Sequence, residues 1–217
     1  MNAIIKKKKT PPPELKLYYD KELIEVGIDE AGRGCLSGRV YVGAVILPKE
    51  IEGDMYKQIK DSKKLSRKKR KVLRRYIERI AIAYSVAYAE PEEVDSLNIL
   101  GATLKTMHKA IDGLSIEPEQ ILVDGNHFNM YMSKSCTFIP HELVINGDNI
   151  YFSIAAASIL AKVYHDEYVE ELCRNEPELQ DKYDWENNMG YGTRSHMNGI
   201  REHGISKYHR KSFKPCR

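Results

Sequence analysis

Four acidic side chains occupy positions from which they could build a catalytic site. Asp29 and Glu30 follow one short apolar run, Asp124 ends another, and Asp148 precedes the longest helical segment. Open α/β sheets place their sites at the ends of strands and the starts of helices. If the four carboxylates converge, protonation or bound cations must relieve their repulsion. Clustered oxygen ligands suit hard ions such as Mg²⁺ or Mn²⁺, and a pair of such ions promotes phosphoryl displacement.

Each acidic residue also has a simpler interpretation. Asp124 can form a turn with the glycine that follows it, and Asp148 can favour the start of a helix through its charge. Asp29 and Glu30 can be a solvated strand end. Because successive side chains on a strand point to opposite faces, these two share a site only if the strand ends or bends there. The glycines that follow permit such a bend.

Two further segments could contact a ligand. Gly32, Arg33 and Gly34 follow the acidic pair and form either an ordinary tight turn or a backbone that a ligand can approach closely. Arg33 could then meet a phosphate that the acidic site alone would repel. Tyr191 lies in a polar, glycine-bearing segment, where it is either a half-buried loop tyrosine or a flat ring that stacks on a sugar or base.

The hydrophobic pattern predicts the elements that position these residues. Strands are expected at residues 23–29, 39–47, 81–89 and 120–124, and helices at 66–80, 97–114, 153–173 and 194–203. Strands mixed with helices predict an α/β domain with helices on both faces of the sheet. Residues 1–20, with a lysine run and three consecutive prolines, are expected to be a flexible tail, and residues 21–217 one domain.

Composition bounds the class of protein. The chain has 217 residues, 42% hydrophobic and 30% charged, with a net charge of +3, which fits one soluble domain. It shows neither a membrane-length apolar run nor a signal peptide, and its four scattered cysteines form no CxxC pair, which argues against a zinc site. We therefore expect a cytoplasmic monomer. The basic runs at 6–9 and 63–75 either attract phosphates or are solvated faces.

The combination of motifs resembles the ribonuclease HII family over roughly residues 24–213. The matching segments are GIDEAGRG at 27–34, DSKKLS at 61–66, the NIL segment at 98–100, VDGN at 123–126, GD at 147–148, SIAAASILAKV at 153–163, GYGT at 190–193 and HRKSF at 209–213. The pairing of DEAGRG with AAASILAKV is highly specific. The resemblance implies a ribonuclease H-like fold, with a central five-stranded mixed sheet and a helical C-terminal part at about 165–217.

The resemblance also implies an activity and roles for the residues. It implies an endoribonuclease that cuts the RNA strand of RNA–DNA hybrids and ribonucleotides embedded in duplex DNA, with divalent Mg²⁺ or Mn²⁺ ions, leaving 5′-phosphate and 3′-hydroxyl ends. By motif position, the metal-binding catalytic carboxylates are Asp29, Glu30, Asp124 and Asp148. The segment that senses the ribose 2′-hydroxyl corresponds to Gly32, Arg33 and Gly34, and the tyrosine that stacks on the adjoining deoxyribose corresponds to Tyr191.

The chain departs from the family pattern at four positions. Cys35 and Arg39 stand where proline is usual, Asn146 where lysine is common, and His165 where arginine is common. The first two changes are expected to loosen the turn and to add a charge beside the site. All four bear on the details of phosphate contact, and none alters the four carboxylates.

Two other functions compete with this interpretation. A non-catalytic nucleic-acid-binding protein would use the basic runs, but it gains nothing from acidic residues near its ligand. Another ribonuclease H-like nuclease, of resolvase or transposase type, does not account for the AAASILAKV and GYGT segments. A ribonuclease HIII usually carries a separate N-terminal domain, for which the residues before the first expected strand leave no room.

Overall fold

A five-stranded mixed sheet forms the centre of the protein. The computed structural model describes residues 14–217, so the basic run at 6–9 lies outside the described residues. The sheet has the order β3-β2-β1-β4-β7, in which β1 pairs antiparallel with β2 and parallel with β4. Its strands are β1 (Glu25–Ala31), β2 (Val40–Ile46), β3 (Ala83–Ala89), β4 (Gln120–Asp124) and β7 (His141–Val144). A separate small hairpin consists of β5 (Tyr131–Met132) and β6 (Phe138–Ile139).

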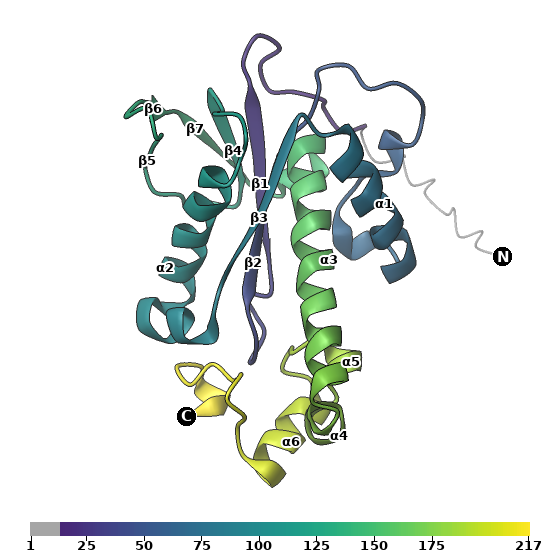
Figure 1. The fold of residues 1–217 in the computed structure, drawn as a ribbon, viewed down its shortest axis with the longest axis vertical. Helices are drawn as coiled ribbons and strands as arrows, with labels where there is room; N and C mark the ends of the chain where they lie inside the picture. The colour runs from purple at the N-terminus through teal and green to yellow at the C-terminus, as the bar shows by residue number, and fades with distance from the viewer. Residues whose placement is uncertain (1–13) are drawn as a thin grey trace, which may run out of the picture.

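Helices cover both faces of the sheet, as the sequence predicts (Figure 1). The helix α2 (Pro91–Asp112) lies on one face, whereas α3 (Phe152–Asn175) and α1 (Arg67–Ile80) lie on the other. The C-terminal part continues from the far end of α3 as α4 (Glu178–Tyr183), α5 (Trp185–Asn188) and α6 (Arg194–His203). Short 3-10 turns span Tyr56–Gln58, Ser62–Lys64, Gly147–Asn149 and Lys214–Cys216. No helix among residues 14–217 combines the length and apolar character that a bilayer crossing needs.

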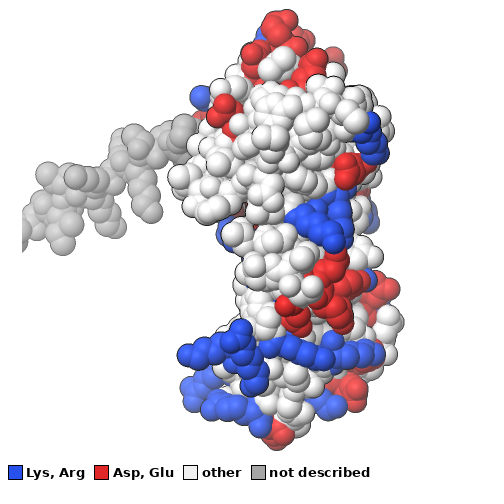
Figure 2. Space-filling view, turned by 90° about the vertical axis from the view of Figure 1, so that its left-hand side faces the viewer, with Lys and Arg blue, Asp and Glu red and all other residues white. Residues whose placement is uncertain are grey.

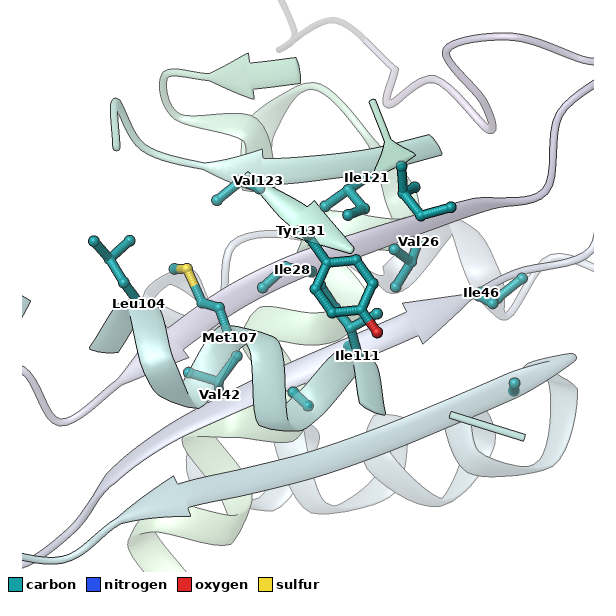
Figure 3. Close-up of a cluster of buried hydrophobic side chains, with 14 residues drawn as sticks. Val26, Ile28, Val42, Ile46, Leu104, Met107, Ile111, Ile121, Val123 and Tyr131 are labelled. Atoms are coloured by element: carbon teal, nitrogen blue, oxygen red, sulfur yellow. The ribbon is translucent and has the colours of Figure 1, made fainter. Parts of the chain in front are cut away.

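The first hydrophobic core lies between the sheet and α2 (Figure 3). Alternate residues of β1, here Val26 and Ile28, point into it because side chains on a strand alternate between faces. Met107 and Ile111 of α2, one helical turn apart, pack against them. The intervening residues of β1 therefore face α3, and Asp29 is one of these.

The helix α3 packs unusually close to the other face of the sheet. A Cβ atom added at Gly43 of β2 would lie 2.5 Å from the carbonyl oxygen of Ala157, closer than real Cβ atoms approach. The consecutive alanines of α3, residues 155–157, have no side chains that would push the helix away. This short distance between helix and strand brings Ser158 of α3 to Asp29 of β1.

The basic run at 63–75 is largely paired within the fold. On α1, Arg70 forms a salt bridge with Asp166 of α3 (3.3 Å), and Lys71 with Glu170 of α3 (2.9 Å). Arg67 also reaches Glu170 (3.2 Å). The sequence allowed two interpretations of this run: a solvated helix face or a phosphate-binding surface. The salt bridges to α3 favour the helix face for this part of the run.

Several element boundaries differ from the predictions. The strand β1 extends to residue 31, so the acidic pair lies inside it rather than at its end. The helix α2 begins at Pro91, with Asn98 in a non-helical conformation inside it. The edge strand β7 was not predicted from the hydrophobic pattern. Within the segment 14–20, Lys16 forms an isolated bridge with Tyr151, and its backbone nitrogen donates to the Ile150 carbonyl (2.8 Å).

Candidate active site

The sheet register places Asp29 beside Asp124. Ile28 of β1 pairs with Val123 of the parallel strand β4, so the next residue of each strand lies level with the other. The charge of Asp124 contributes to the raised pKa of Asp29, after burial and the charge of Glu30, and Ser158 of α3 lies beside the Asp29 carboxyl group. Asp29 is only 5% exposed. Two segments far apart in the sequence thus bring two of the four predicted carboxylates together.

Asp148 reaches the same edge of the sheet through the turn that follows β7. The Gly147 nitrogen donates to Asp124 Oδ1 (2.7 Å), which fixes this turn against the end of β4. Asp148 is 4% exposed, and its carboxyl group lies within hydrogen-bonding reach of Asp61. The site therefore contains a fifth acidic side chain, which the sequence reasoning did not assign.

The acidic groups raise one another's pKa values. Burial, and then the charges of Glu30 and Asp124, raise the pKa of Asp29 well above its ordinary value. Burial is also the largest cause that raises the pKa of Asp124. Burial and the charges of Asp61 and Asp124 raise the pKa of Asp148 to about 6. A shared electrostatic field on this scale requires that the carboxylates lie close together.

Two basic side chains balance part of this negative charge. Arg33 Nη1 forms a salt bridge with Glu30 Oε1 (3.0 Å), and this contact lowers the pKa of Glu30 against the larger effect of burial, which raises it. The charge of Lys63 lowers the pKa values of Glu30, Asp124 and Asp148. The Lys63 ammonium group therefore lies within reach of three of the four predicted carboxylates.

The carboxylates share one edge of the sheet without forming a compact ligand cluster. Across residues 14–217, no three His, Cys, Asp or Glu side chains are gathered tightly enough to hold a metal ion. The carboxylate of Glu30 is turned toward Arg33, and that of Asp148 toward Asp61. The sequence left open whether the four carboxylates converge; Asp29 and Asp124 lie level on adjacent strands, and Glu30 pairs with Arg33 beside them.

A cavity of about 180 Å³ adjoins the acidic edge. It brings together Glu30, the whole glycine–arginine–glycine loop and Tyr191, all of which the sequence singled out. Its lining residues are Glu30, Ala31, Gly32, Arg33, Gly34, Ser62, Lys63, Ser158, Lys162 and Tyr191. The wall of the cavity thus contains acidic, basic and aromatic side chains. It also contains the backbone of two glycines, which have no side chains to cover it.

Tyr191 is tied to the loop that it faces. Cys35 forms an isolated antiparallel bridge with Tyr191, and the Leu36 nitrogen donates to the Gly190 carbonyl (2.8 Å). Tyr191 is 37% exposed, lines the cavity and is tied to the loop through its backbone, which limits its freedom to move.

The loop needs glycine at residue 32. Its φ is +89°, in the left-handed region that favours glycine. A Cβ atom there would lie 2.6 Å from Cδ2 of His165. His165 is fully buried, with its Nε2 3.4 Å from Cys35 Sγ and its Nδ1 3.1 Å from Asp166 Oδ1. Cys35 and His165, two of the departures from the family pattern, are thus packed against each other beneath the loop.

The expected effects of Cys35 and Arg39 need correction. Cys35 is fully buried and contacts both His165 and the Met189 carbonyl (3.4 Å), so it anchors the turn rather than loosening it. Arg39 adds no free charge beside the site. Its guanidinium pairs with Glu90 (2.7 Å) and lies over the ring of Tyr88, 3.9 Å from the ring centroid.

Sequence reasoning missed three residues of this site. Asp61 and Lys63 belong to the DSKKLS segment, and Ser158 to the AAASILAKV segment. Both segments supported the family resemblance, but neither contains one of the four predicted carboxylates. These three residues could have been found from the sequence only because they belong to highly specific motifs. Membership in such a motif indicates a functional role even where the spacing of the residues does not.

Solved structures identify the class of fold. The ribonuclease H2 of Pyrococcus horikoshii OT3 superposes with a TM-score of 0.70, at 23% identity, over 88% of this chain and 94% of that one. A ribonuclease HIII, Bst-RNase HIII solved in complex with Mn²⁺, superposes with a TM-score of 0.66, at 20% identity, over 94% of this chain and 69% of that one. The protein therefore has the ribonuclease H-like fold, as expected.

The sequence relationship is closer. The family described as Ribonuclease HII matches residues 26–216. The Ribonuclease HII of Bacteroides thetaiotaomicron is 50% identical over 196 residues, which is 90% of this chain and 92% of that protein. The chain belongs to the ribonuclease HII family, and it is a ribonuclease H. This excludes the alternative of a purely binding protein.

Proposed function

We propose that the protein is an endonuclease that hydrolyses RNA paired to DNA and cuts at single ribonucleotides embedded in duplex DNA. The observation that carries the proposal is the meeting of carboxylates from separate segments at one edge of the sheet, beside a cavity lined by the Gly32–Gly34 loop and Tyr191. The products would carry 5′-phosphate and 3′-hydroxyl ends.

The donor chemistry of the site fits divalent metal ions. Asp29, Glu30, Asp124 and Asp148 provide only oxygen ligands, as Mg²⁺ and Mn²⁺ prefer. Their raised pKa values mean that a bound cation would relieve a repulsion already present. A ribonuclease HIII of the same fold was solved with Mn²⁺. Two bound ions would activate water and neutralise charge on the phosphate; Glu30 would first have to leave its salt bridge with Arg33.

The chain's own residues would perform the remaining tasks. Ser158 lies beside the Asp29 carboxyl group, and the Gly147 nitrogen donates to Asp124 Oδ1 and so orients it. Lys63 lines the cavity within reach of three carboxylates, where its ammonium group would attract the scissile phosphate. Arg33, once it releases Glu30, would offer a second cation to the same strand.

The loop and Tyr191 would recognise the ribonucleotide. Glycines leave the backbone of the loop open to the cavity, and backbone groups can hydrogen-bond to a 2′-hydroxyl, the feature that distinguishes RNA from DNA. The fixed ring of Tyr191 would stack on the adjoining deoxyribose. Both roles were predicted from the family resemblance and remain predictions.

The surface charge suits a nucleic-acid duplex near the C-terminal helices. Figure 2 shows Lys and Arg gathered at the lower end of the molecule, which carries these helices, whereas acidic side chains lie above them and at the top of this view. Exposed basic residues in this part include Arg194, Arg201 and Lys211. We propose that a monomer binds the duplex across this end, and that it acts in the cytoplasm, where its four free cysteines would stay reduced.

The decisive experiment uses a labelled DNA duplex with one ribonucleotide. Incubation with Mg²⁺, with Mn²⁺ or with chelator, followed by mapping of the cut, should show metal-dependent cleavage on the 5′ side of that ribonucleotide. An all-DNA duplex is the control and should stay intact. Cleavage in the presence of chelator, or of the all-DNA duplex, would overturn the proposal.

A further inference from the structure

A buried arginine from the C-terminal segment holds the loop that lines the cavity. Arg210 is fully buried, although it lies 177 residues from Arg33 in the sequence. Its Nη1 donates to the carbonyl oxygens of Arg33 (3.1 Å) and Cys35 (2.8 Å), and its Nε donates to that of Gly38 (3.0 Å). One guanidinium therefore fixes three peptide groups along a short stretch that begins inside the Gly32–Gly34 loop.

These contacts determine which way the loop presents its backbone. In a trans peptide the carbonyl and the N–H point in opposite directions. Because the Arg33 carbonyl points inward to Arg210, the N–H of Gly34 in the same peptide group points the other way. Gly34 lines the cavity beside Tyr191, so this N–H is a donor directed at a ligand there.

The contacts of Arg210 are carbonyls rather than carboxylates. Within residues 14–217 no acidic side chain forms a salt bridge with it, and its Nη2 has no hydrogen-bond partner. A buried charge without a counter-ion is costly to a fold. A gain in the stability of the protein therefore does not account for the presence of Arg210 at this position. The ring of Phe213 lies 5.3 Å from Arg210 Cζ and helps to orient the guanidinium.

We propose that Arg210 is a positioning residue for ribonucleotide recognition. It acts through the loop: it turns the Arg33 carbonyl inward and so keeps the Gly34 N–H aimed at the 2′-hydroxyl. This inference rests on the proposed function, because it assumes that the loop reads the ribonucleotide. It also assigns the HRKSF segment a task, which links the C-terminal part of the molecule to the cavity.

The test compares Arg210→Lys with the wild type on two substrates. The readout is the ratio of kcat/KM for a duplex with one ribonucleotide to kcat/KM for a long RNA–DNA hybrid. A lysine keeps the charge, but its single nitrogen cannot occupy both the Nη1 position, which bonds the Arg33 and Cys35 carbonyls, and the Nε position, which bonds that of Gly38. Because a small misplacement of a positioning group can cost on the order of 100-fold, we expect the ratio to fall about 10- to 100-fold. A long hybrid offers many hydroxyls and many cut sites, so it should suffer less.

The ratio separates positioning from general damage. Partial unfolding lowers the active fraction equally for both substrates and leaves the ratio unchanged. Arg217→Lys, at an exposed arginine of the same segment, is the matched control. The fluorescence of Trp185, the single tryptophan, reports whether the C-terminal part stays folded. If Arg210→Lys does not fold, Phe213→Leu decides, and we expect it to lower the ratio to a smaller extent.

Two outcomes overturn the inference in different ways. An unchanged ratio in folded Arg210→Lys, or in Phe213→Leu when the first variant does not fold, refutes the role of Arg210 alone. Failure of the wild-type protein to cut at the single ribonucleotide refutes the proposed function, and the inference with it.

Discussion

The Asp29 carboxyl group is placed where its charge is costly. It is buried, and both Glu30 and Asp124 lie close enough to raise its pKa. The fold alone gains nothing from this, since a neutral side chain of the same shape would avoid both the desolvation and the repulsion. Such a group is retained at a functional site when a bound cation or substrate compensates for it. A substitution that removes this charge should therefore make the protein more stable and less active.

We predict that Asp29→Asn abolishes cleavage and stabilises the metal-free protein. A raised pKa means that the charged form of Asp29 opposes folding at neutral pH, so the neutral amide should raise the free energy of unfolding by about 1 kcal/mol. Activity should fall on the order of 10³-fold or more, while binding to a hybrid stays largely intact. Urea unfolding with chelator, gel-shift binding and cleavage assays measure the three effects.

Asp181→Asn is the control for Asp29→Asn, because Asp181 is exposed on α4. It should change neither stability nor rate appreciably. Full activity of Asp29→Asn would remove Asp29 from the mechanism, and a less stable variant would contradict the electrostatic argument.

Tyr191 offers a second prediction at this scale. We expect Tyr191→Ala to impair cleavage at a single embedded ribonucleotide about 10-fold more than cleavage of a long hybrid, because the ring would stack on one deoxyribose at the junction. Tyr191→Phe keeps the ring and loses only the hydroxyl, so it should lie between the wild type and the alanine variant. Comparing kcat/KM on both substrates measures the effect. Equal losses on both would count against junction reading.

Among the elements, α2 contains a break with a definite cause. Asn98 has φ 57° and ψ 167°, a conformation that side chains rarely adopt, and its Oδ1 accepts hydrogen bonds from the Leu100 (2.9 Å) and Gly101 (3.1 Å) nitrogens. The side chain thus caps the second stretch of the helix and compensates for the strained backbone.

We predict that Asn98→Ala destabilises the protein by about 1–2 kcal/mol, because it removes the cap and keeps the strain. Urea unfolding measures this change. Asn98→Asp keeps the acceptor oxygen and should lose much less stability. If the alanine and aspartate variants were equally stable, the cap would have no role.

Periodicity predicted the elements that have one clear apolar face, and missed those that do not. The helix 194–203 and the strand 120–124 were placed correctly, since each has a regular pattern or a buried run. The edge strand β7, His141–Val144, has none: its side chains are partly or fully exposed, and its one neighbour in the sheet is β4. Yet β7 carries the turn that delivers Asp148, so pattern analysis missed the element on which one predicted carboxylate depends.

The site residues were predicted from motifs because contacts between distant segments have no periodic signature. Asp61 and Asp148 meet across 87 positions, and Asp29 and Asp124 across 95 (61 to 148 and 29 to 124). No local pattern encodes such distances. The family resemblance supplied Asp29, Glu30, Asp124 and Asp148, whereas only the structure shows Asp61 and Lys63 among them. The inward-facing Arg210 was likewise invisible before the fold was known.

In the molecule as a whole, the C-terminal part has its own core. Trp185, Tyr183, Val169 and Leu179 form a cluster at the far end of α3. Two buried histidines join it: Trp185 Nε1 donates to His196 Nε2 (3.0 Å), and the Nε2 atoms of His196 and His209 lie 3.0 Å apart. This part also carries Tyr191 and Arg210, so its stability bears directly on the cavity.

The histidine pair should make the protein less stable as the pH falls. Burial, and then the charge of His196, lowers the pKa of His209 from 6.5 to about 4. Between these values the unfolded chain binds a proton that the folded chain does not, so stability present above pH 6.5 is lost toward pH 4. The groups that face His209 are His196, Ser206, Tyr183 and Trp185, none of them acidic. The loss attributable to His209 should amount to about 1–3 kcal/mol.

The carboxylates of the active site act in the opposite direction. Asp148, with its pKa raised to about 6, takes up a proton more readily in the folded state and adds stability as the pH falls. The pH dependence of the wild-type protein's stability therefore combines two opposite effects, and the test must separate the effect of His209. In His209→Gln the loss between pH 6.5 and 4.5 should shrink relative to the wild type, when urea unfolding is followed by Trp185 fluorescence. Parallel profiles for the two proteins would show that His209 binds a proton as readily in the folded chain as in the unfolded chain, and would remove it as the source of acid sensitivity.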